Sequence, residues 1–216
     1  MKKTIFTILM LTAVILTAIS CKDKAKEAEI TEAEDVSIEI TDSETYIAIT
    51  EASTIEWKGF KPTGSHHGTI GIESGGLEMS NDKIVGGTFN IDMTSIVVKD
   101  IPADDEKNGK LLGHLKSPDF FDVENHETAV FTITGIEEVE GQTLLSGNLA
   151  IKNIENNITF PISVTKDENG VVLSSEAFSI DRSKWDVKYG SKSFFDNLGD
   201  KFINDDIELK ILVKAS

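Results

Sequence analysis

From Tyr46 to the C-terminus, apolar and polar residues alternate with a period of two over most of the chain. This alternation predicts β-strands with one buried and one solvated face, because successive side chains of a strand point to opposite sides. Many short strands of this kind predict an antiparallel sandwich or a closed barrel. The apolar positions fall into these runs: Ile55 and Trp57; Phe89, Ile91 and Met93; Ala129, Phe131 and Ile133; Leu145, Leu149 and Ile151; Ile158, Phe160, Ile162 and Val164; Ile207, Leu209, Ile211 and Val213.

Stretches rich in glycine, asparagine and aspartate separate these runs and predict turns. They are "SGG" (74–76), "SNDK" (80–83), "EGQ" (140–142), "ENN" (155–157) and "KDENG" (166–170).

Two stretches depart from the period of two. The segment Pro102–Phe121 has acidic residues near its start and leucines at helical spacing, and Ser117-Pro118 ends the pattern. It predicts a helix that crosses or caps one end of the barrel. The irregular stretch Asp181–Lys201 predicts short helical turns before the last strand.

The N-terminus has the pattern of a secretory signal. A basic start is followed by the apolar run Ile5–Ile19 and a small residue before Cys21. A cysteine at this position predicts a bacterial lipoprotein signal over residues 1–20, with diacylglycerol on the Cys21 thiol; ordinary cleavage that leaves a free thiol is the alternative. Residues 21–44 are rich in Glu, Lys and Ala and predict a solvated, flexible tether. Residues 45–216 then form the folded domain.

Charge and composition exclude several classes of function. The formal net charge of the chain is −16, and Arg182 is its only arginine, so a nucleic-acid interface is not expected. One cysteine excludes an internal disulfide framework. An acidic domain would not be attracted to an anionic bilayer, so membrane attachment would depend on the acyl chains of the anchor.

The adjacent histidines His66 and His67 raise the question of a metal site. Neighbouring residues of a strand face opposite ways, so this pair cannot chelate one ion together. A site would need His114 or His126 and carboxylates to converge on one of them, and the four histidines of the chain show no zinc spacing. We expect His66 to face inward or to lie at the barrel rim, and His67 to be solvated.

Catalytic motifs are also missing from the sequence. No G-x-S-x-G elbow and no acid–base constellation stands out, so an enzyme is not expected. Glycines interrupt the inward registers, and they either bend strands at barrel corners or leave room for a guest.

Four segments in order resemble the YceI-like family of secreted bacterial proteins: "STIEWKGFKPTGSHHGTI", "GGTFNIDMTSI", "LLGHLKSPDFFDVENHETAVF" and "FSIDRSKWDVKYG". The resemblance covers the chain from about Tyr46 to its end. It implies an elongated, eight-stranded, antiparallel, lipocalin-like barrel with an apolar tunnel for polyisoprenoids, and it implies no catalytic residue and no cofactor. The family usually has glycine after the tryptophan of the last segment, where this chain has Asp186, and we expect a turn there.

The inward positions are the candidates for the tunnel wall: Trp57, Phe89, Ile91, Leu112, Leu115, Phe131 and Phe178. Each could instead be ordinary core. Polar candidates for a lipid head group are His66, His114, Arg182, Lys110 and Lys116. For Arg182, the competing interpretation is an ion pair with Asp181 or another surface acid.

The sequence therefore favours a lipid-anchored, non-catalytic carrier or store for an isoprenoid-type lipid or quinone. It would be secreted across the inner membrane and held in the envelope of a Gram-negative bacterium, with the membrane and the lipid as partners. A homodimer is one of the assemblies that the sequence permits. The alternatives are an envelope interaction module with a filled interior, and a metal or haem binder that uses His66, His114 and His126.

Overall fold

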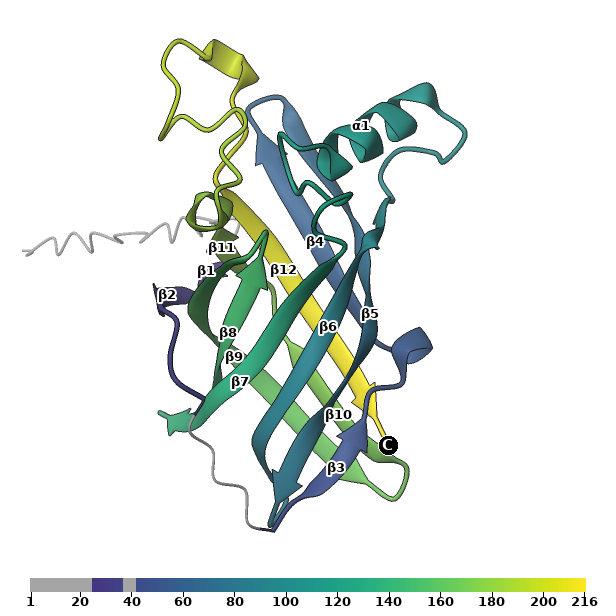
Figure 1. The fold of residues 1–216 in the computed structure, drawn as a ribbon, viewed down its shortest axis with the longest axis vertical. Coiled ribbons are helices and arrows are strands. Elements are labelled where there is room, and N and C mark those ends of the chain that lie inside the picture. The colour runs from purple at the N-terminus through teal and green to yellow at the C-terminus, as the bar shows by residue number, and fades with distance from the viewer. Residues whose placement is uncertain (1–24, 37–41) are drawn as a thin grey trace, which may run out of the picture.

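The alternating segments form one sheet that closes into a ring of eight strands (Figure 1). The computed structural model describes residues 25–36 and 42–216. Neighbouring strands of the ring are antiparallel, and the last strand pairs with both the first and the seventh, so the expected barrel is confirmed. The ring consists of β4 (Thr54–Lys61), β5 (Gly64–Ser80), β6 (Lys83–Val98), β7 (Thr128–Val139), β8 (Gln142–Ile151), β9 (Ile154–Asp167), β10 (Gly170–Ser175) and β12 (Asp206–Ala215).

The barrel interior holds the hydrophobic core, as the period of two predicts. On β6, for example, Phe89, Ile91 and Met93 are buried, whereas Asn90 and Asp92 between them are only partly buried. The same alternation on the other strands directs their apolar side chains inward and their polar side chains to solvent.

The turn predictions are confirmed in part. "SNDK" and "EGQ" form tight hairpin turns with left-handed backbone, for example at Asn81 (φ 50°) and Asp82 (φ 60°). "SGG" and "ENN" are wrong, because they lie inside β5 and β9. Gly75 has φ 143° beside a register shift of β5, and a Cβ there would lie 2.4 Å from the Thr88 carbonyl oxygen, so this glycine allows close strand approach instead of a turn.

The predicted helix is α1 (Glu106–Lys116), which lies at one end of the barrel (Figure 1). Asp105 caps its N-terminus by accepting a hydrogen bond from the Lys107 amide, 2.8 Å away, and Ser117 is its C-cap. The buried Asn108 side chain donates to the Ile101 carbonyl at 2.7 Å and ties the helix to the segment after β6. No helix in the described part of the chain is long and apolar enough to cross a membrane.

Short helical turns occupy the second irregular stretch, as expected: η2 (Arg182–Trp185) and η3 (Gly199–Lys201); a third, η1 (Thr50–Ala52), precedes β4. Asp186 follows η2 with φ 58° and ψ 25°, a left-handed conformation that favours glycine. This turn explains why glycine is the usual residue at the position and confirms the expected turn.

The N-terminal part differs from the expected tether. Residues 26–32 lie on the barrel as β1 (Lys26–Glu27) and β2 (Glu29–Glu32), which pair with β11 (Phe178–Asp181) and β9, and β3 (Glu44–Ile47) pairs with β5. We call residues 26–32 the N-terminal strap. Backbone hydrogen bonds hold the strap on the barrel. Every residue type can form such bonds, so the charged composition of the segment did not reveal them. The predicted signal peptide (1–20) and Cys21 lie outside the described residues.

Candidate functional site

Two apolar cavities lie inside the barrel. The first, which we call the α1-end cavity, has a volume of about 110 Å³ and reaches the underside of α1 and η2. The second, the deep cavity, has a volume of about 70 Å³ and lies farther along the barrel. Ile55, Ile91, Leu149 and Leu209 line both, so the two cavities are adjacent segments of one apolar path.

The strands place the predicted tunnel residues at these cavities, with one exception. Trp57, Ile91 and Leu115 line the α1-end cavity, and Phe89, Ile91, Phe131 and Phe178 line the deep cavity. Leu112 lines neither and packs, partly buried, against the core. It lies three residues before Leu115 on α1, but only Leu115 is buried among the leucines of that helix. A role of these residues in ligand binding stays a prediction.

The barrel is filled at the end farthest from α1. Leu77, Met79, Ile84 and Val171 are buried there and line neither cavity. Their strand ends lie opposite α1 in Figure 1. Within the described residues, the two cavities therefore do not extend to this end of the barrel.

The volumes of the two cavities limit the size of the group that each can hold. For comparison, an engineered apolar cavity of about 150 Å³ in another protein holds benzene. The cavities of this barrel, at about 110 and 70 Å³, are smaller but of the same order. Each is sized for a branched five-carbon unit or less, so the path suits a thin chain and excludes a broad ring system.

Arg182 lies at the α1 end and is almost fully buried, with 2% of its surface exposed. Its guanidinium donates to the carbonyl oxygens of Asn204 (3.1 Å from Nε) and Tyr189 (2.9 Å from Nη2), and also to Val187 and Ile203. Nη2 also lies 3.3 Å from Asp205 Oδ1. Burial lowers the pKa of Arg182, and the carboxylates of Asp205 and Asp181 oppose that shift.

These contacts favour the ion-pair interpretation of Arg182, with Asp205 as the acid, and this acid is largely buried. Most of the guanidinium donors bond to backbone carbonyls of residues 187–204. Arg182 therefore clamps the loop between η2 and β12 over the α1-end cavity, where it also stacks on Phe120, 5.3 Å from the ring centroid. Arg182 also lines the α1-end cavity, and its role toward a lipid head group stays a prediction.

Two buried polar atoms near this end have no hydrogen-bond partner within the described structure: Trp57 Nε1 and His114 Nε2. Trp57 is part of the α1-end cavity wall. The His114 ring packs edge-on against Tyr189, with centroids 4.4 Å apart, and against Phe120. An unpaired buried donor is costly, and a ligand oxygen that accepts from it would remove that cost.

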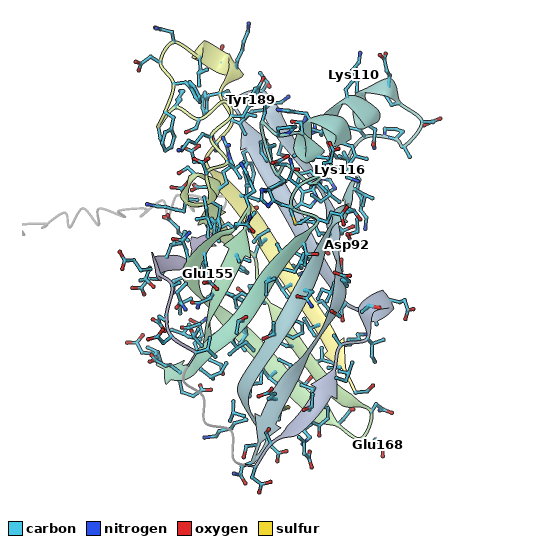
Figure 2. All side chains as sticks on the ribbon, viewed as in Figure 1. Asp92, Lys110, Lys116, Glu155, Glu168 and Tyr189 are labelled. Carbon is cyan, nitrogen blue, oxygen red and sulfur yellow. The ribbon has the colours of Figure 1, made fainter. Side chains whose placement is uncertain are left out.

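The other polar candidates are engaged at the surface. Lys110 pairs with Glu106 at 2.6 Å, and Lys116 donates to the Thr94 carbonyl at 2.6 Å. Figure 2 shows both lysines on α1, at the same end as Tyr189. Neither lysine lines either cavity.

His66 and His67 lie beside Asp100 and line neither cavity. His66 Nδ1 is 2.8 Å from Asp100 Oδ2, and the backbone amide of His67 donates to Asp100 Oδ1 at 2.9 Å. Burial raises the pKa of Asp100, but these hydrogen bonds outweigh it, so the pKa lies below its usual value. His66 is thus a half-buried rim residue and His67 is exposed, as expected.

The histidines do not converge. His66 pairs with Asp100, His126 lies 3.7 Å from Asp122, and His114 packs among aromatic rings. Across residues 25–36 and 42–216, no group of three or more His, Cys, Asp or Glu side chains is arranged to hold a metal ion. Among the described residues, His66, His114 and His126 therefore form no shared metal site.

Comparison with known proteins identifies the fold. The YceI-like domain family matches residues 46–215. The chain belongs to the YceI-like domain family. No curated protein sequence matches it.

Solved structures with the same fold support this assignment. One is BcnA of Burkholderia cenocepacia, with a TM-score of 0.59 and 18% sequence identity, over 76% of this chain and 96% of that one. Another is a domain from Saccharophagus degradans described as polyisoprenoid-binding and implicated in plant cell wall breakdown, with a TM-score of 0.57 and 15% identity, over 79% and 97% of the two chains. At these identities the likeness shows the YceI-like fold alone.

Several wall residues of this YceI-like barrel were not among the predicted site residues. Leu149, Phe160 and Leu209 stand in the alternating runs, so the period of two marked them as inward without marking them as cavity walls. Phe120 and Trp185 stand in irregular segments, and only the tertiary fold brings them to the cavity. Trp185 is fully buried and donates from Nε1 to the Leu149 carbonyl at 2.8 Å.

Proposed function

We propose that this protein binds a long apolar chain, of the polyisoprenoid or isoprenoid-quinone class, inside its barrel and carries or stores it without chemical change. The observation that supports this most strongly is the pair of neighbouring apolar cavities, the α1-end cavity and the deep cavity, which share four wall residues inside the barrel. The structural likeness to a domain described as polyisoprenoid-binding supports the same ligand class.

Burial of apolar carbon accounts for useful affinity. One five-carbon unit contributes at most about 4 kcal/mol at ~0.8 kcal/mol per buried carbon. One unit in each cavity would contribute up to about 8 kcal/mol, which corresponds to micromolar binding before ordering costs are subtracted. Apolar fit discriminates poorly between chains, so selectivity would depend on the polar atoms at the α1 end.

We place this function in the bacterial envelope. The signal pattern over residues 1–20 and Cys21 support a lipid anchor. Phe194 and Phe195 are exposed at 48% and 51% in the loop between η2 and η3. They support a membrane setting further, because exposed phenylalanines can insert at the boundary between head groups and acyl chains. Mass analysis of the N-terminal peptide tests the anchor: diacylglycerol on Cys21 is expected, and an unmodified thiol in the native host would contradict it.

Tryptophan fluorescence tests the binding itself, because both tryptophans of the chain, Trp57 and Trp185, line the α1-end cavity. A benzoquinone with a two-unit isoprenoid tail should quench this fluorescence saturably. The same quinone without a tail is the control and should quench only by collision, in proportion to its concentration. Identical quenching by both compounds would contradict the proposed function.

A further inference from the structure

The barrel wall has a seam between β9 and β11. The lower part of β9, residues 162–167, pairs with β10, but β10 ends at Ser175. Beyond that point β11 pairs with β12 on one side, and it does not pair with the upper part of β9. The N-terminal strap fills this space: Lys26 and Glu27 pair with β11, and residues 29–32 pair with β9 (Figure 1).

The seam opens onto the apolar path. Ile158 and Phe160 of β9 and Phe178 of β11 line the deep cavity, and Ile180 of β11 lines the α1-end cavity. Behind the strap, the rings of Phe160 and Phe178 stack across the seam, with centroids 4.2 Å apart and planes 9° from parallel. The seam is therefore closed twice, by a backbone strand outside and by one aromatic contact inside.

The strap is held mainly by backbone hydrogen bonds. Only Ala28 is buried and Ile30 partly buried, whereas the charged side chains of the strap are exposed. Next to the strap, the buried Asn148 forms a latch: its Oδ1 accepts from the Glu34 amide at 3.0 Å, and its Nδ2 donates to the Glu34 carbonyl at 2.7 Å. A short segment with little buried apolar surface opens locally at lower cost than a core strand.

We propose that the N-terminal strap is a removable strand that closes a lateral portal between β9 and β11, through which an apolar chain enters the barrel sideways. This inference rests on the proposed function. The strap lies outside the region that the family model matches, residues 46–215. With Cys21 anchored, the covalent chain to Lys26 spans at most about 18 Å, which holds the portal next to the membrane.

A reversible disulfide tests the portal. Glu29 and Thr159 face each other on β2 and β9, at a spacing that a disulfide can bridge. The double variant Glu29→Cys/Thr159→Cys is made in the chain from residue 21 onward, with Cys21→Ser to remove the only native thiol. The matched control is Glu138→Cys/Thr143→Cys, an opposed pair in the β7–β8 hairpin away from the seam.

The measurement is the rate of uptake of a dansyl-labelled farnesyl chain from phosphatidylcholine vesicles. In the Glu29→Cys/Thr159→Cys chain, which we call the seam variant, oxidation should slow uptake at least about tenfold, because the disulfide prevents local opening of the strap. Reduction should restore the rate. The control pair should be insensitive to oxidation. Asn148→Ala, which releases the latch, should accelerate uptake and does not depend on disulfide formation.

The outcomes separate the portal from the proposed function. Saturable binding with equal uptake rates in the oxidised and reduced seam variant would overturn the portal and leave the proposed function standing. Failure of every form, including the chain with native seam residues, to bind the farnesyl probe would contradict the proposed function and the portal with it.

Discussion

The α1-end cavity and the deep cavity share four wall residues but differ in their surroundings. The deep cavity lies among aliphatic and aromatic side chains, with the Phe160–Phe178 stack on one side. The α1-end cavity has Arg182, which pairs with Asp205, among its lining residues, together with Trp57, whose buried indole N–H has no hydrogen-bond partner within the described structure. Burial in the deep cavity can supply affinity for any apolar chain, whereas only the α1 end can distinguish one polar group from another.

The largest expected effect is the loss of stability on replacing Arg182. Arg182→Met removes hydrogen bonds to four backbone carbonyls and leaves Asp205 without its cation. We expect the free energy of unfolding to fall by about 3–5 kcal/mol, because one member of a buried ion pair is lost. Urea denaturation measures this. The matched control is Lys110→Met, which removes only the exposed pair with Glu106 and should cost less than about 1 kcal/mol. Equal effects of the two substitutions would refute the clamp.

Filling the α1-end cavity with a side chain tests whether the ligand occupies this cavity as well as the deep cavity. Gly59 lines that cavity, and a Cβ at this position would have no heavy atom within 4 Å. Gly59→Leu should therefore fold normally and lower the affinity for an isoprenoid chain by about 30-fold or more, because it occupies the space of roughly one five-carbon unit. Isothermal titration measures the affinity.

The control for Gly59→Leu is Gly113→Leu, which adds the same atoms on the exposed face of α1, where a Cβ also has free space. It should leave affinity unchanged. If Gly59→Leu bound the chain as tightly as this control, the ligand would not occupy the α1-end cavity.

The preference for a chain with an oxygen-containing head group over a plain hydrocarbon chain is expected to depend on Trp57. Trp57→Phe keeps an aromatic ring in the wall but removes the unpaired Nε1 donor. The ratio of affinities for a chain with an oxygen-containing head group and for the corresponding hydrocarbon should fall by about tenfold, the effect of one hydrogen bond. A matched series of isoprenyl alcohol and isoprenyl hydrocarbon measures this ratio. An unchanged ratio would mean that Trp57 has no part in head-group selection.

The smallest effects are expected at His66 and His67 of β5, which line neither cavity. His67→Ala should leave stability and ligand retention nearly unchanged, and His66→Ala should cost less than about 1 kcal/mol. Because the pKa of Asp100 is lowered in the folded state, its stabilisation is present above the unfolded pKa and is lost as the pH falls through the lower, folded value. His66→Ala should reduce that acid-dependent loss below pH ~4.

Acid unfolding followed by circular dichroism measures the pH effect, with His67→Ala as the control that keeps the His66–Asp100 pair. A strong loss of stability or of ligand retention in His67→Ala would show that the rim belongs to the binding site after all.

The parts of the fold that depend on the order of apolar and polar side chains could be predicted from the sequence. The period of two identified inward residues such as Phe89, Phe131 and Leu209. Leucines at helical spacing, with acidic residues before them and Ser117-Pro118 after them, identified α1. Asp186 was expected in a turn because glycine is usual there, and its left-handed backbone is the physical reason.

The remaining features depend on backbone partners that are distant in sequence. Arg182 donates to carbonyls of residues 187–204, and any residue type supplies a carbonyl, so no motif marks the acceptors. The N-terminal strap is likewise attached through its backbone, and its charged side chains match those of a solvated tether.

The central claim is that an apolar chain occupies the barrel, and native mass spectrometry tests it most directly. The mature protein is purified gently from the envelope of its own host and weighed intact. The account predicts an added mass of several hundred daltons that organic extraction removes. A bare polypeptide mass that stays bare after incubation with isoprenoid quinones and isoprenyl phosphates would contradict it, and would favour an interaction module with a filled interior.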